Sequence, residues 1–331
     1  MSRYDFEPKW FIVLIFTLAG IFVGGLGLLI WLFNDQGTFN LQKIHPSKNT
    51  YKFVNPLLAV DTNEKREFLQ SPIFSSELTN IIQKSQNTNN TVTAAAYFRD
   101  LESGRWAGVN EGSNFSPGKL LKIPIMMAYL QQETESPGFL NQKLVYESDY
   151  QTLTSSSLTI GRSYSVEDLI NAMMLDGDDL AANVLYDHID KNSLQALYSD
   201  LGIYFPEDKE KDDFLSVKQF ALFFRVLYNA TYLNRDSSEK ALEILSQGTL
   251  KDGLVLTLPK NLTVSHRYHT RNYKESGQTL IESHSCGIIY YPDHPYLLCL
   301  VGVSDNNQKI DNLFNTISQF VYNDFANRYK K

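Results

Sequence analysis

The stretch Phe115-Ser-Pro-Gly-Lys-Leu-Leu-Lys-Ile-Pro124 carries most of the information about the fold. Its Ser116-Pro117 pair is typical of a helix start, because serine favours the N-cap and proline the first turn. The apolar pattern that follows predicts a helix over 119–132. Lys119 and Lys122 are three residues apart and lie on one face of that helix. The segment therefore predicts an apolar helix whose first turn presents two ammonium groups.

Working outward, strand patterns occur near both ends of the remaining sequence and helical patterns fill the middle. The expected strands cover 91–98, 105–109, 262–268, 286–291 and 296–303. The expected helices begin near 75, 119, 165, 178, 216, 237 and 310. This order predicts an α+β fold: an antiparallel sheet built from N- and C-terminal segments, with flanking helices and an inserted all-helical lobe.

Four local matches, in this order, give the chain a resemblance to a known family. The quoted segment resembles FSPASLLKVP, 164–170 with 178–183 resembles the helix pair carrying a Ser-Asp-Asn motif, 264–267 resembles the strand carrying Lys-Thr-Gly, and 286–292 with 295–299 resembles the strand pair that follows. The chain thus resembles the class A β-lactamase-like and penicillin-binding-protein-like serine hydrolases over about residues 72–328. The resemblance implies their fold.

The resemblance also implies a chemistry, which this sequence has largely lost. In the family, a serine at a helix N-terminus forms an acyl-enzyme, assisted by a lysine one turn later and by the two further motifs. The three motifs fall on Lys119 and Lys122, on Gly177, Asp178 and Asp179, and on Arg267, Tyr268 and His269. Both hydroxyls and the glycine of the third motif are replaced. We therefore expect a degenerate member, and we interpret Glu207 and Glu210, near the family's deacylating glutamate, as a solvated loop.

Two catalytic alternatives remain for this helix. Ser116 and Lys119 satisfy Ser-x-x-Lys, so an active β-lactamase or D-alanyl-D-alanine peptidase could use Ser116 as nucleophile and Lys119 as base. The shift of three residues moves the hydroxyl almost one helical turn, so we favour Ser116 as a cap. Repulsion from Lys122 could instead make Lys119 a nucleophile. Because Asp178 and Asp179 should approach the same cleft, we expect a structural Lys–Asp network.

The N-terminal part predicts a membrane anchor. Residues 10–33 contain no charge and are long enough to cross a bilayer. We divide the chain into a short cytoplasmic segment over 1–9, a transmembrane anchor over 10–33, a linker over 34–70 and a β-lactamase-like domain over 71–331. The Lys/Arg count does not decide the orientation. The resemblance implies a single-pass cell-membrane protein with its domain on the extracytoplasmic side.

Composition excludes several other functions. The chain of 331 residues has a net charge of −7 without a basic block, so no nucleic-acid partner is expected. No Cys/His spacing predicts a metal, and no cofactor is expected. Cys286 and Cys299 lie on strands flanking a turn, about one diagonal apart, where a disulfide or two buried thiols both fit.

Three functions fit these observations. The first is a tethered pseudo-hydrolase that binds a cell-wall fragment or a protein partner. A cleft holding Lys119, Lys122, Arg267 and His269 could bind an anionic ligand. The second is the active serine hydrolase described above. The third is a structural surface protein whose cleft is packed shut.

Overall fold

The computed structural model describes residues 51–56, 70–89, 93–147, 156, 158–205, 213–248 and 252–329. The chain divides into two compact units, 1–49 and 50–331. The segments expected over 1–9 and 10–33 lie outside the described residues, as do Glu207 and Glu210. Within the described ranges, no helix combines the length and the apolar character that crossing a bilayer requires.

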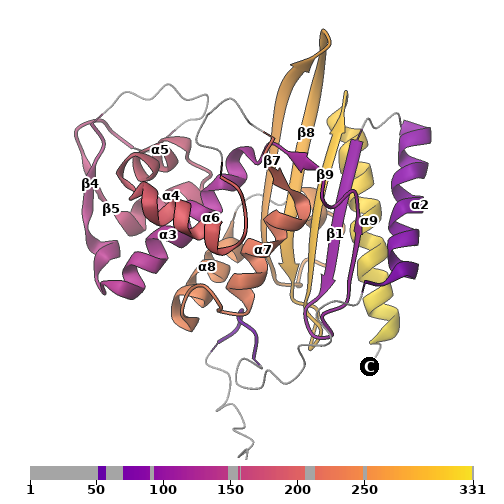
Figure 1. Cartoon of the computed structure of the whole chain (residues 1–331), viewed down its shortest axis with the longest axis horizontal. Helices are drawn as coiled ribbons and strands as arrows, with labels where there is room; N and C mark the ends of the chain where they lie inside the picture. The colour runs from indigo at the N-terminus through magenta and orange to yellow at the C-terminus, as the bar shows by residue number, and fades with distance from the viewer. Residues whose placement is uncertain are drawn as a thin grey trace, which may run out of the picture. The chain divides into compact units, whose positions relative to one another are not determined.

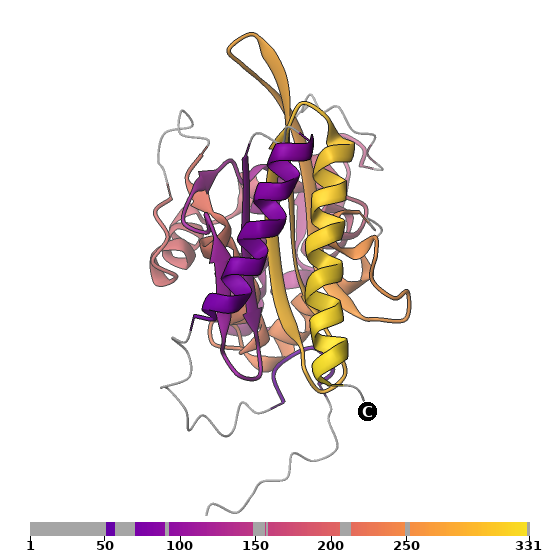
Figure 2. The same ribbon diagram turned by 90° about the vertical axis from the view of Figure 1, so that its right-hand side faces the viewer.

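A five-stranded antiparallel sheet of order β2-β1-β9-β8-β7 forms the centre of the domain. The strands are β1 (Thr93–Asp100), β2 (Trp106–Val109), β7 (Val264–Glu275), β8 (Gln278–Ile289) and β9 (Tyr296–Ser304). Since β1 pairs with β9, strands from the two ends of the domain lie side by side, and the expected sheet is confirmed. Strands β7 and β8 run further than predicted and project beyond the sheet as a hairpin (Figure 2). Their outer residues are mostly polar and exposed, so no apolar alternation marked them as strand.

Helices cover both faces of the sheet. Helices α2 (Pro72–Asn89) and α9 (Asn307–Arg328) lie side by side on one face (Figure 2), and the expected helical lobe lies on the other (Figure 1). The lobe contains α3 (Lys122–Glu135), α4 (Val166–Leu175), α5 (Asp179–His188), α6 (Lys191–Asp200), α7 (Val217–Tyr228) and α8 (Arg235–Gln247). Each face has its own apolar core, so the α+β fold predicted from the sequence is confirmed.

Polar side chains fix where several lobe helices begin. Ser165 accepts the backbone N–H of Asp168 at the start of α4, as predicted. Ser216 forms a complete capping box with Gln219 at the start of α7. The prediction for Ser116 was wrong, because it does not cap a helix.

The chain between Ser116 and α3 explains this difference. Ser116 directly follows the short strand β3 (Asn114–Phe115), and the next turn, η2 (Gly118–Leu121), is a 3₁₀ helix capped by Pro117 without a side-chain hydrogen bond. Gly118 has φ +49°, a left-handed conformation that suits glycine. The 3₁₀ turn thus begins one residue later than the Ser-Pro signal indicated, and α3 begins three residues later than the predicted start at 119.

Cys286 on β8 and Cys299 on β9 form a disulfide. The two residues are direct cross-strand partners, not diagonal neighbours as the sequence had suggested. Both are buried beneath the helical lobe. The bond therefore links two central strands, and neither cysteine is a free thiol.

Residues 51–56, which the sequence placed in the linker, pack on the domain instead. Phe53 and Val54 are 4% exposed. The Glu239 carboxylate on α8 accepts the backbone N–H groups of Lys52, Phe53 (2.8 Å) and Val54 (2.9 Å). Because three successive N–H groups converge on one half-buried carboxylate, this contact is specific.

Replacing Glu239 with alanine should loosen this segment. Three backbone N–H groups would lose their common acceptor, so we expect a loss of about 1–3 kcal/mol in the free energy of unfolding. Urea denaturation measures the change. Glu243→Ala is the matched control, because this exposed glutamate lies one turn later on α8. Equal stability of the two variants would contradict a role for the carboxylate in holding residues 51–56.

Candidate functional site

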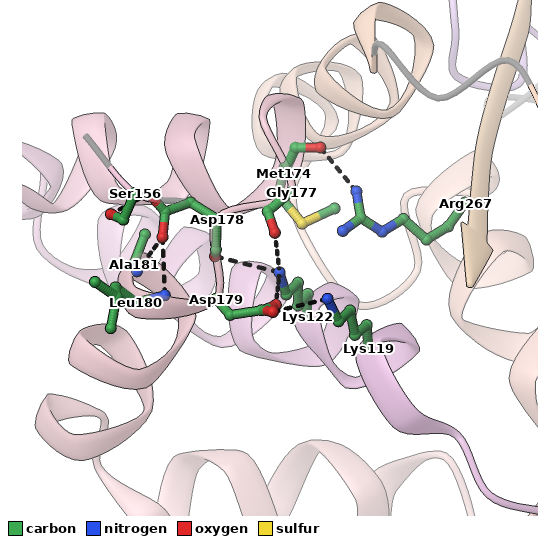
Figure 3. Close-up of polar contacts among 10 residues, drawn as sticks. All are labelled: Lys119, Lys122, Ser156, Met174, Gly177, Asp178, Asp179, Leu180, Ala181 and Arg267. Carbon is green, nitrogen blue, oxygen red and sulfur yellow. Dashed lines mark hydrogen bonds and ion pairs between the residues drawn. The ribbon is translucent and has the colours of Figure 1, made fainter. Parts of the chain in front are cut away.

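Three elements meet where the helical lobe adjoins β7. The η2–α3 segment brings Lys119 and Lys122, the start of α5 with the two residues before it brings 177–179, and β7 brings Arg267 (Figure 3). Strand β7 also carries His269. These elements carry the three motif positions assigned from the sequence. The fold therefore brings the positions together, although several residues at them have changed.

One carboxylate holds both lysines. Asp179 Oδ2 lies 2.7 Å from Lys119 Nζ, and Asp179 Oδ1 lies 2.8 Å from Lys122 Nζ (Figure 3). Lys122 also donates to the carbonyl oxygens of Gly177 (2.8 Å) and Asp178 (3.2 Å). The three N–H bonds of its ammonium are thereby satisfied. The structure contains the Lys–Asp network that the sequence suggested, with Asp179 as its centre.

The network shifts the ionisation of its members. Burial would raise the pKa of Asp179, but hydrogen bonds and positive charge from Lys119 and Lys122 outweigh it and lower the pKa to about 2. Burial lowers the pKa of Lys122 to about 8, although the bond to Asp179 opposes the change. At neutral pH the carboxylate is charged and Lys122 is mainly an ammonium, so Lys122 is not a ready nucleophile.

Asp178 was expected in the Lys–Asp network, but its side chain has a different role. Its Oδ1 accepts the N–H groups of Leu180 (2.8 Å) and Ala181 (3.1 Å) at the start of α5, and its Oδ2 accepts the Ser156 hydroxyl (2.5 Å). This aspartate is the helix N-cap. Only its backbone carbonyl reaches Lys122, so the side chain is turned away from the lysines (Figure 3).

On β7, successive residues of the third motif point to opposite faces of the sheet, because side chains alternate along a strand. Arg267 donates from Nη1 to the Met174 carbonyl (2.8 Å), at the end of α4 (Figure 3). Burial lowers the pKa of Arg267 to about 10, which leaves it charged at neutral pH. Tyr268 instead packs in the core under α9, on the opposite face of the sheet. Our assignment of Tyr268 to a possible cleft is therefore corrected.

His269 fills space above the first turn of the η2–α3 segment. A Cβ added to Gly118 would lie 2.3 Å from His269 Nε2, so the imidazole rests directly against the glycine backbone. The His269 side chain is buried at 8% exposure. Burial, and then the neighbouring His284 and Lys119, lower its pKa to about 3, so it is neutral at physiological pH. An imidazole thus stands where the family's third motif has a glycine.

Ser116 lies outside this arrangement. It is buried at 6% exposure and precedes Pro117. Among the described contacts, Lys119 Nζ donates to Asp179 and not to Ser116. The structure places Lys119, not Ser116, on the turn that faces the second and third motifs.

Beside the Lys–Asp network is a pocket of about 400 Å³. Its polar end is formed by Lys119, Lys122, Asp179 and Asn183, and its other walls are mainly apolar. The remaining lining residues are Gly118, Leu121, Ile125, Ala182, Tyr186, Leu194, Tyr198 and Phe205. The lysine side of the site is therefore open, and the expectation of a cleft packed shut does not describe it. No group of His, Cys, Asp or Glu side chains within the described ranges is arranged to hold a metal ion.

The cleft expected from the sequence contained Lys119, Lys122, Arg267 and His269, but only the two lysines line this pocket. Its apolar walls were not predicted, although part of their signal is present in the sequence. Asp179, Asn183 and Tyr186 recur at helical spacing on α5, and Leu194 and Tyr198 do so on α6. Each set marks one helix face. The sequence did not show that the two faces meet beside Lys119.

The fold and the three converging motif positions define the class of serine β-lactamases and penicillin-binding proteins. Residues 74–325 match the Beta-lactamase2 model, described as the β-lactamase enzyme family, and the chain belongs to this family of serine hydrolases. No curated protein matches the sequence.

Solved structures of similar fold cover most of the chain. PBP-A, solved as an acyl-enzyme complex with penicillin G, is 19% identical, covers 78% of this chain and 98% of its own, and has a TM-score of 0.64. The extended-spectrum β-lactamase TLA-3 is 18% identical; the match covers 76% of this chain and 99% of TLA-3, with a TM-score of 0.67. A β-lactamase from Sphaerobacter thermophilus is 14% identical; the match covers 74% of this chain and 95% of that β-lactamase, with a TM-score of 0.64. At these identities the likeness is one of fold.

The Asp179 network predicts a pH-dependent contribution to stability. Its pKa falls from 3.8 in the unfolded chain to about 2, so the stabilisation is full above pH 4 and is lost as the pH falls through 2. We expect Asp179→Asn to lower the free energy of unfolding by about 2 kcal/mol at pH 6. Chemical denaturation at several pH values should show this difference shrinking between pH 4 and pH 2.

The matched control is Asp176→Asn, which neutralises an exposed carboxylate three residues earlier. Its effect should be small at every pH. A difference between wild type and Asp179→Asn that stayed constant down to pH 2 would contradict the assigned pKa of Asp179.

Proposed function

We propose that the protein is a membrane-anchored, extracytoplasmic pseudo-hydrolase that binds a cell-wall-related ligand or a protein partner. One observation carries the proposal: the residue at the family's nucleophile position, Lys119, is an ammonium held 2.7 Å from the Asp179 carboxylate. An ammonium has no lone pair with which to attack an acyl carbon.

Two further changes support the loss of catalysis. Gly177 stands where the family's second motif has a serine, so no side chain there can pass a proton. The His269 imidazole rests against Gly118, at the turn where backbone N–H groups would hold an oxyanion. A substrate carbonyl would have to displace this ring before it could approach the turn.

The alternative is an active hydrolase with Ser116 as nucleophile and Lys119 as base. The burial of Ser116 before Pro117, and the engagement of Lys119 by Asp179, weigh against it. A nucleophile and its base need to be within hydrogen-bond reach of one another. We therefore favour binding over hydrolysis.

The membrane part of the proposal rests on the sequence. The 24 uncharged residues over 10–33 have the length of a transmembrane helix, and the family resemblance favours an outward-facing domain. The open pocket beside Lys119 favours a ligand-binding role over a purely structural one.

A fluorescent penicillin tests the loss of acyl transfer. We expect no covalent adduct on the full-length protein under conditions that label an active penicillin-binding protein, and the same result for Ser116→Ala. In-gel fluorescence and intact-protein mass spectrometry provide the measurement. An adduct on the wild type that disappears in Ser116→Ala would overturn the pseudo-hydrolase assignment and favour the Ser116 mechanism.

The anchor can be tested separately. The full chain should sediment with membranes of a bacterial host and resist carbonate extraction, whereas a chain starting at Thr50 should be released. Protease added to spheroplasts should digest the domain of the full chain. Full protection from the protease, with a cytoplasmic control also intact, would place the domain on the inner side and contradict the proposed orientation.

A further inference from the structure

The pocket beside Lys119 has a chemical asymmetry that the proposed function does not specify. One end carries the ammonium groups of Lys119 and Lys122, and the opposite walls carry aromatic and aliphatic side chains. We propose that this pocket binds a small amphipathic carboxylate, with its acidic group on Lys119 and its apolar group between α5 and α6. This inference rests on the proposed function, because it requires Lys119 to bind its ligand non-covalently.

Lys119 is the group best placed to bind the acid. Within the described contacts, its Nζ donates to Asp179 alone, and its side chain is 41% exposed. An ammonium has three N–H bonds, so two directions remain for a ligand. Lys122 is only 5% exposed, and its three acceptors already use its donors. Lys122 therefore contributes charge, whereas Lys119 contributes hydrogen bonds.

The local charge favours an anion. Lys119, Lys122 and Arg267 are cations, and the carboxylates of Asp178 and Asp179 are the anions of the same cluster. With His269 neutral, one positive charge is left over. A bound carboxylate would balance this excess in a partly desolvated site, where charge complementarity is stronger than in water.

Tyr186 on α5 adds an aromatic side chain to the lining of the pocket and is 38% exposed. Lys191 Nζ lies 3.2 Å from the centroid of its ring, so this ring also makes a cation–π contact.

The apolar walls determine what nonpolar group the ligand can carry. Leu194 and Tyr198 from α6, Ile125 from α3 and Phe205 form a surface suited to an aromatic ring or a short aliphatic chain. Asn183 adds one amide near the polar end. A volume of about 400 Å³ lies in the lower part of the range of small-molecule sites. The ligand class is therefore a carboxylate with one compact apolar group, such as an acylated amino acid or a short fatty acid.

Probe compounds that differ only in charge test the proposal. The full-length protein in nanodiscs would be titrated with 4-phenylbutanoate, 4-phenylbutanol and 4-phenylbutylamine, followed by saturation-transfer NMR and calorimetry, with empty nanodiscs as the reference. We expect the carboxylate to bind at least about tenfold more tightly than the alcohol, since a charge-assisted hydrogen bond is added. The amine should bind least.

Two variants separate the charge from the cavity. Lys119→Met should weaken the binding of the carboxylate probe about tenfold and change the binding of the alcohol little. Lys309→Met on α9 is the distant control for this variant. Ala182→Leu fills part of the pocket without altering its charge, so it should weaken the binding of both the carboxylate and the alcohol. Ala326→Leu on α9 is the control for this variant. Comparison of N-acetylphenylalanine with octanoate then distinguishes a peptide-like source from a fatty acid.

The outcomes also distinguish this proposal from the one it rests on. Absence of probe binding, equal binding of acid and alcohol, or full retention of binding in both variants would overturn the pocket assignment. Any of these results without a penicillin adduct would leave the pseudo-hydrolase proposal standing. A penicillin adduct lost in Ser116→Ala would overturn that proposal instead.

Discussion

The site depends on one carboxylate shared between two ammonium groups. Asp179 lies within 2.8 Å of both Lys119 and Lys122, which originate one turn apart on the same segment. Without it, two positive charges would face each other at the edge of an apolar lobe, where repulsion is poorly screened. The ion pairs also tie the η2–α3 segment to the start of α5. The contact that neutralises the site therefore joins two of its three elements.

The same interaction joins two of the family's motif positions. In an acyl-transfer site, the nucleophile must be able to pass its proton to a base within hydrogen-bond reach. At this site the nucleophile position carries a charge that needs a partner, and the aspartate in the second motif supplies it. Lys119 and Asp179 compensate one another, so the two departures from the family pattern form one coupled change. The sheet and its two apolar cores need neither catalytic hydroxyl.

The sequence predicted what depends on local periodicity and missed what depends on long-range register. The sheet of N- and C-terminal strands, the lobe and the α4 cap at Ser165 follow from apolar spacing and capping residues. The direction of Tyr268, toward the core under α9, follows from strand alternation, but the motif was carried over as a unit. The contact of His269 with Gly118, and the pairing of Cys286 with Cys299, depend on register. Local patterns do not contain that register.

The cavity beside the motif positions remains open although the Lys–Asp network and His269 occupy the positions themselves. The imidazole of His269 occupies the approach to Gly118, yet the space bounded by α3, α5 and α6 stays open at about 400 Å³. An open pocket with apolar walls loses packing contacts that a filled one would have. A cavity of this kind supports the proposed binding role. Its polar end includes Lys119, so the residue at the nucleophile position also lines the open pocket.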